Sequence, residues 1–63
     1  MIEDSQLLEY YLWGFCDEIE ELEKAVLPSD VLIHKAYNLG RSHGKTNNEY
    51  ISNQQIIHLI RYV

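Results

Sequence analysis

The sequence predicts an all-α fold, a small three-helix domain or a helical hairpin followed by a short C-terminal helix. Apolar residues recur at helical spacing near the N-terminus, capping and stop residues punctuate the rest, and no segment alternates apolar and polar residues as a strand would. With 63 residues the chain forms a single domain, residues 1–63, with helices expected at about 6–26, 30–43 and 53–62. A chain this short buries only a small core.

The first predicted helix, over about residues 6–26, carries a regular apolar seam. The seam alternates steps of four and three residues, which keeps its members on one line along the helix. Its residues are Leu8, Leu12, Phe15, Ile19, Leu22 and Val26. We expect Ser5 to cap the N-terminus and Pro28 to end the helix, because proline disfavours helical geometry in the residue before it. The result would be a long, amphipathic, acidic helix with the seam packed inward.

The second predicted helix, over about residues 30–43, has its first positions supplied by Pro28, Ser29 and Asp30. Its expected inner face consists of Leu32, Ile33, Ala36, Leu39 and Gly40. The small residues Ala36 and Gly40, one turn apart, would let another helix approach closely. Gly44 is expected to end this helix in the left-handed conformation that glycine adopts easily.

The third predicted helix, over about residues 53–62, begins after a polar connector. Ser52 with Gln55 forms a capping pattern, and Thr46 with Glu49 forms an earlier one that could open a turn. We favour the later start. The inward residues are then Ile56, Leu59, Ile60 and Val63.

The segment GRSHGKT, residues 40–46, is similar in order to a phosphate-binding loop but does not meet its requirements. Three residues separate its glycines where that loop needs four, and a helical pattern rather than a strand precedes it. We therefore expect no bound nucleotide and interpret Arg41, His43 and Lys45 as solvated bases at the end of a helix. Without a basic helix, direct binding to nucleic acid is not expected either.

Catalysis, cofactors and metals are also not expected. The three histidines, His34, His43 and His58, lack the spacing of a metal motif, and Cys16 lies beside acids that disfavour its thiolate. As the only cysteine, Cys16 allows no internal disulfide, which fits a reducing cytoplasm. The N-terminal stretch MIEDSQ is acidic, and no apolar run approaches the ~18 residues of a membrane span. We expect a cytoplasmic protein without a membrane partner.

The net charge of -5 is unevenly distributed. Residues 1–27 hold eight acids against Lys24, a balance of -7, whereas residues 28–63 have a balance of +2. The acids concentrate in FCDEIEELEK, where five carboxylates on a helix would be spaced about as densely as the charges of duplex DNA, roughly one per 1.7 Å. Such a surface would suit binding to a basic, nucleic-acid-binding surface, although a run of charges also serves as a solvated face.

These patterns predict a small acidic protein that acts by binding, an inhibitor or adaptor for a nucleic-acid-handling protein. In size and charge it is comparable with phage-type inhibitors of host or defence enzymes, some of which act as nucleic-acid mimics. Tyr10 and Trp13 lie on the predicted outer face, where either the third helix or a partner would cover them. The expected partner-binding residues are Tyr10, Trp13, Asp17, Glu18, Glu20, Glu21 and Glu23. The alternative is a self-associating structural or assembly module, a homo-oligomer that pairs through the seam and the Ala36/Gly40 face.

Overall fold

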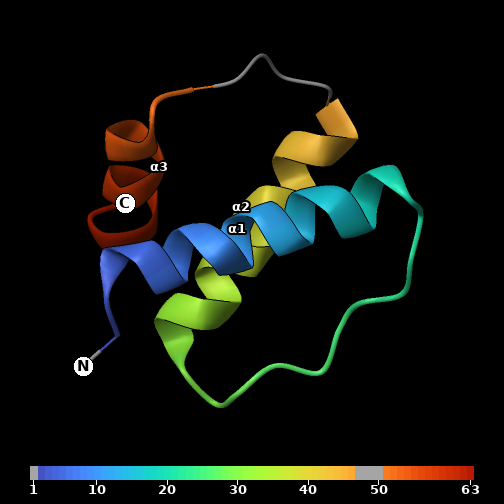
Figure 1. The fold of residues 1–63 in the computed structure, drawn as a ribbon, viewed down its shortest axis with the longest axis horizontal. Coiled ribbons are helices and arrows are strands. Elements are labelled where there is room, and N and C mark those ends of the chain that lie inside the picture. Colours follow the sequence, from blue (N-terminus) through green and yellow to red (C-terminus); the bar gives the residue numbers. More distant parts are fainter. Residues whose placement is uncertain (1, 47–50) are drawn as a thin grey trace.

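The structure, a computed structural model, describes residues 2–46 and 51–63, and within them it contains three helices and no strand. The helices are α1 (Asp4–Ile19), α2 (Val31–Thr46) and α3 (Asn53–Arg61). Figure 1 shows α1 crossing in front of α2, with α3 beside the N-terminal end of α1. The all-α class predicted from the sequence is therefore confirmed.

The crossing of α1 over α2 depends on glycines in both helices. A Cβ atom on Gly14 would overlap the main-chain oxygen of Tyr37, and one on Gly40 would overlap the main-chain oxygen of Tyr11. The two backbones are thus in direct contact, closer than any side chain at these positions would permit. The prediction that Ala36 and Gly40 form a face for close helix approach is confirmed, with Ala36 fully buried.

The buried face of α1 differs from the predicted seam. Its buried residues are Leu7, Tyr11, Gly14 and Asp17. By contrast, Leu12 is 54% exposed and Ile19 is 57% exposed, so the seam lies to one side of the contact with α2. Consecutive residues are separated by 100° around a helix, and the position without a side chain, Gly14, is the one that faces α2. Close backbone contact therefore sets Gly14 against α2 and leaves Leu12 and Ile19 of the predicted seam at the surface, while Leu8 still packs against the core.

α1 ends at Ile19 rather than near residue 26, because the chain forms a helix-ending turn there. The main-chain NH of Leu22 donates to the main-chain oxygen of Asp17 at 2.9 Å, and the main-chain NH of Glu21 donates to the main-chain oxygen of Glu18 at 3.1 Å. Glu21 has a φ of 58°, the left-handed conformation that this C-terminal motif requires. Acidic side chains repel one another and oppose the negative end of the helix dipole, so this segment favours ending the helix.

The helix starts also differ in detail from the predictions. Glu3, not Ser5, caps α1, in a reciprocal capping box with Gln6. Asp30 lies before α2 rather than within it, and its carboxylate accepts from the main-chain NH of Leu32 at 2.8 Å. At the start of α1, the acidic residue Glu3 thus performs the capping that the sequence predicted for Ser5.

The prediction for the end of α2 is wrong, whereas the prediction for the start of α3 is confirmed. Gly44 does not end α2; it is buried inside the helix, where a Cβ would lie 2.8 Å from the main-chain oxygen of Phe15. The capping of α3 is as predicted, since the Ser52 hydroxyl accepts from the NH of Gln55 at 3.2 Å. The alternative capping pair ends at Glu49, which lies outside the described residues.

One apolar cluster joins the three helices. It consists of Leu7, Tyr11, Ala36, Ile56 and Ile60. Of the inward residues predicted for α3, Ile56 and Ile60 are buried, Leu59 is partly buried and Val63 is exposed. The guanidinium of Arg61 bonds the Asp4 carboxylate at 2.8 Å and the Ile2 oxygen at 3.0 Å, and so ties α3 to the start of the chain.

Candidate interaction surface

The seven predicted partner-binding residues divide into two groups in the structure. Asp17 and Glu18 point toward α2 and are used in contacts within the molecule. The others lie at the surface, with Tyr10 partly buried beneath it. These are Tyr10, Trp13, Glu20, Glu21 and Glu23. A candidate interaction surface therefore contains only the second group.

Asp17 is a structural residue, because its buried carboxylate belongs to a network centred on Tyr37. The Tyr37 hydroxyl donates to Oδ2 of Asp17 at 2.7 Å and accepts from the main-chain NH of Ala25 at 3.1 Å. It also accepts from Nη1 of Arg41 at 3.1 Å. A buried carboxylate needs such donors, since an unsatisfied one costs free energy on leaving water. The expectation that Asp17 faces a partner is therefore wrong.

Arg41 extends this network to the chain that follows α1. Its Nε lies 3.1 Å from the Glu18 carboxylate, and its Nη2 donates to the main-chain oxygen of Leu22 at 2.9 Å. The hydrogen bond with Tyr37 raises the pKa of the Arg41 guanidinium, burial lowers it, and the bond with Glu18 raises it. Arg41 is thus not the freely solvated base that its position in the sequence suggested; it holds the turn after α1 against α2.

Trp13 lies at the surface with one side supported from within. Its ring stacks on that of Tyr10 with centroids 5.8 Å apart, and the Tyr37 ring lies perpendicular to it with centroids 6.1 Å apart. The indole remains 45% exposed. The sequence left open whether α3 or a partner covers it. In the structure, Tyr37 of α2 supports Trp13 and its outer side remains accessible.

Three carboxylates follow α1 in a group that we call the acidic turn, Glu20, Glu21 and Glu23. All three are exposed. The ion pairs within residues 2–46 and 51–63 join Arg41 with Glu18 and Arg61 with Asp4, so the acidic turn takes part in neither. Because the helix ends at Ile19, these acids do not continue a helical row with Asp17 and Glu18. The evenly spaced array comparable with DNA is therefore not formed.

Where side chains are described, no group of three or more His, Cys, Asp or Glu residues could hold a metal ion. The Tyr11 hydroxyl lies 2.6 Å from Nδ1 of His43, which places that histidine in a packing contact between helices. Residues 40–46, the segment similar to a phosphate-binding loop, belong to α2, so their backbone is helical and cannot wrap around a phosphate.

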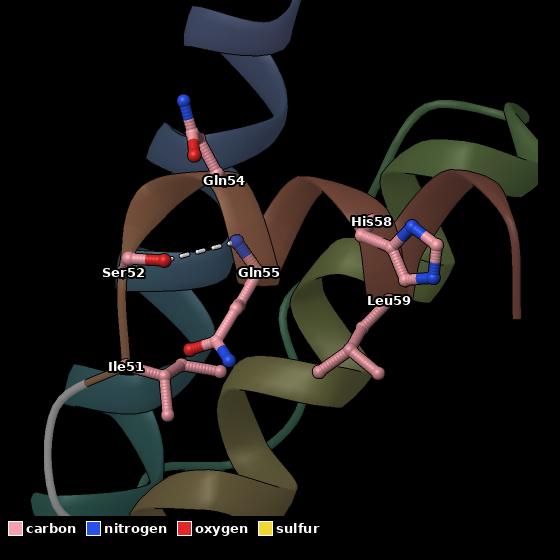
Figure 2. A pocket seen from close by; sticks show the side chains of 6 residues that line it. All are labelled: Ile51, Ser52, Gln54, Gln55, His58 and Leu59. Atoms are coloured by element: carbon pink, nitrogen blue, oxygen red, sulfur yellow. Dashed lines mark hydrogen bonds between the residues drawn. The ribbon is translucent and has the colours of Figure 1, made fainter.

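A hollow on the surface of α3 is open to solvent. Ile51 and Leu59 supply its apolar part, and the Ser52 hydroxyl is occupied in capping. Figure 2 shows this bond to Gln55 and shows the Gln54 side chain pointing to the opposite side. Ser52 and His58 also line this hollow, and Figure 2 shows their side chains at opposite ends of it.

Comparisons of the chain with models of protein families, with curated proteins and with solved structures found no match. None of the helices in the described residues is both long and apolar enough to cross a membrane. Sequence reasoning missed the roles of Tyr37 and Arg41, although their spacing of four residues places them on one side of a helix. That spacing was the available signal, but it does not reveal which acid the pair would meet.

Proposed function

We propose that this protein acts by binding, as an inhibitor or adaptor that docks the acidic turn and Trp13 on a basic surface of a nucleic-acid-handling protein. The single observation that carries the proposal is the exposed group of Glu20, Glu21 and Glu23, which is free of the ion pairs formed elsewhere in the described residues. Carboxylates left in solvent retain their full capacity to attract a cationic partner.

The aromatic residue beside this group supports the same reading. Glu20 is the C-cap of α1 and keeps a helical backbone conformation, and it follows Trp13 by seven residues, two helical turns, so both lie on the same side of the helix. Trp is the residue type that most often dominates the free energy of protein association, whereas surrounding charges set the association rate and the choice of partner. Trp13 would therefore supply a contact of high affinity, and the acidic turn would supply orientation and steering.

The arrangement of the turn supports a preorganised surface. Arg41 and Tyr37 hold the main chain at Leu22 and Ala25 against α2, on either side of Glu23. A partner would not need to order this segment fully upon binding, which reduces the entropic cost of association.

The proposal is tested by capturing partners of the tagged protein from a bacterial lysate and eluting them in steps of rising salt. We expect one basic nucleic-acid-binding protein to elute with salt from the wild type and to be lost from the triple variant Glu20→Gln, Glu21→Gln, Glu23→Gln. Salt screens exposed charges strongly, so a salt-dependent elution identifies an electrostatic contact. The dissociation constant of the captured protein would then be measured by calorimetry, with a loss of at least about tenfold expected.

A charge-matched control separates the acidic turn from net charge. The variant Asn38→Lys, Ser42→Lys, Gln54→Lys also raises the net charge by three, at exposed positions on α2 and α3. It should retain the partner. Equal binding by the glutamine variant and the wild type would contradict the proposal and leave the acids as a solvated face.

A further inference from the structure

A hollow on α1 beside Trp13 combines aromatic rings with a carboxylate. It has a volume of about 200 Å³ and is lined by Gln6, Glu9, Tyr10 and Trp13. These residues recur at intervals of three and four, so their side chains share one side of the helix. We call this hollow the aromatic hollow. Drug-sized ligands occupy pockets of roughly 300–1,000 Å³, so the aromatic hollow has the size for a single side chain.

The carboxylate of the aromatic hollow is available to a cation. Glu9 is exposed and takes part in neither ion pair formed within residues 2–46 and 51–63. The first 23 residues of the chain contain no lysine, arginine or histidine, so α1 carries no basic side chain of its own. A cation that entered the hollow from a partner would therefore meet an acid that these ion pairs leave unneutralised.

The aromatic rings narrow the choice of cation. The Trp13 indole is about half exposed and stacks on Tyr10. Aromatic faces attract cations, indole most strongly, and a planar guanidinium also stacks on them. A guanidinium can in addition donate two parallel hydrogen bonds to one carboxylate, whereas an ammonium group acts as a point charge. The combination of Trp13 with Glu9, one helical turn away, therefore favours arginine over lysine.

The protein already holds one of its own arginines in this way. The guanidinium carbon of Arg41 lies 5.8 Å from the centroid of the Tyr37 ring, and Nε of the same side chain lies 3.1 Å from the Glu18 carboxylate. One aromatic ring and one glutamate thus suffice to hold a guanidinium in this fold. The aromatic hollow offers the same two groups at the surface of a single helix.

From these observations we infer that the aromatic hollow receives one arginine side chain of the partner, with the guanidinium against Trp13 and bonded to Glu9. The inference rests on the proposed function, because this arginine belongs to the basic surface on which the acidic turn docks. Glu20 lies on the same side of α1 as Trp13, roughly 10 Å further along the helix at 1.5 Å per residue. The hollow thus adds a requirement for a guanidinium, which the acidic turn alone does not impose.

Blocked amino acids that differ only in their side chains test this choice without a partner. The N-acetyl methylamides of arginine, lysine and citrulline are titrated into isotope-labelled protein, and binding is followed by the NMR signal of the indole NH of Trp13, the only tryptophan. We expect saturable binding of the arginine compound in the millimolar range, binding of the lysine compound at least about threefold weaker, and no binding of the uncharged citrulline compound. Equal binding of the arginine and lysine compounds, or an indole signal that does not respond, would overturn the inference.

Two variants place the binding in the aromatic hollow. Glu9→Gln should weaken binding of the arginine compound about two- to fivefold, and Trp13→Leu, followed by the main-chain amide signals of α1, should weaken it by a similar factor. Asn38→Lys raises the net charge by one, as Glu9→Gln does, but at an exposed position on α2, and should bind as the wild type does. Circular dichroism checks that each variant stays helical. Full binding by Glu9→Gln would contradict the inference.

These measurements fail separately from the test of the proposed function. Loss of a captured partner from the acidic-turn variant, without arginine binding in the hollow, would retain the proposed function and overturn the inference. Selective arginine binding that needs Glu9 and Trp13, with a partner that the acidic-turn variant still captures, would retain the hollow as a guanidinium site and overturn the docking role of the acidic turn.

Discussion

Tyr37 is the residue on which most of the polar interior depends. Its hydroxyl has one proton to donate, which goes to Asp17, and it accepts from Ala25 and Arg41. Three parts of the chain, α1, α2 and the segment between them, thus meet at one oxygen atom. The structure satisfies every buried side-chain nitrogen and oxygen of the described residues, and this network accounts for the buried carboxylate.

Replacing Tyr37 by Phe should therefore lower the free energy of unfolding by about 1–3 kcal/mol, because Asp17 stays buried and loses its donor. Urea unfolding followed by circular dichroism measures this change. Tyr62→Phe, at an exposed position, is the control and should be neutral. A neutral effect of Tyr37→Phe would mean that Asp17 reaches water or another donor.

At the scale of elements, α1 and α2 are held together by backbone contact as much as by side chains. Gly14 and Gly40 face each other's helices at positions where a Cβ would overlap main-chain oxygen. Main-chain atoms cannot move aside as the end of a flexible side chain can. The crossing therefore tolerates no substitution there without a shift of one helix.

Gly40→Ala should consequently destabilise the fold by at least about 2 kcal/mol, although alanine favours helix formation by about 1 kcal/mol over glycine. Thermal unfolding monitored by circular dichroism tests this. The exposed position Asn38 on the same helix provides the comparison, since Asn38→Ala should be neutral or slightly stabilising. Greater stability of Gly40→Ala would contradict the close contact.

The sequence predicted the helices better than their faces. Helical periodicity identified all three elements, and the Ser52 cap of α3 follows from local chemistry alone. The buried side of α1 could not be read in the same way. Leu12 and Ile19 form the more regular line, but the choice between faces depends on Gly14 meeting α2, a contact between distant parts of the chain.

The candidate surface was predicted in part for the same reason. The order of residues alone shows that acidic residues are concentrated after Phe15. Which of them stay in solvent depends on where Tyr37 and Arg41 of α2 lie, and that is a tertiary property. Asp17 and Glu18 were thus assigned to the wrong environment, while Glu20 and its neighbours in the acidic turn are exposed.

At the scale of the whole molecule, one apolar cluster makes the three helices interdependent. Ile56 and Ile60 of α3 pack with Leu7 of α1 and Ala36 of α2. A 63-residue chain has a free energy of unfolding of roughly 3–9 kcal/mol in total, so we expect no single helix to be stable without the others. We therefore expect the molecule to unfold in a single cooperative transition.

Ile60→Ala should lower the free energy of unfolding by about 2–5 kcal/mol, a large part of the total. Differential scanning calorimetry of the wild type should give one transition, and the variant should give one transition at a lower temperature. Leu22→Ala, at a half-exposed position outside the cluster, serves as the control. Two separate transitions in the wild type would show that α3 unfolds independently.

The half-exposed position of Trp13 has an optical consequence. It is the only tryptophan, and its indole has one side against Tyr10 and Tyr37 and the other in water. Unfolding would hydrate the ring fully and move its emission to longer wavelength, whereas covering its outer side would move the emission to shorter wavelength. The direction of the shift therefore distinguishes loss of structure from occupation of the surface, without an added label.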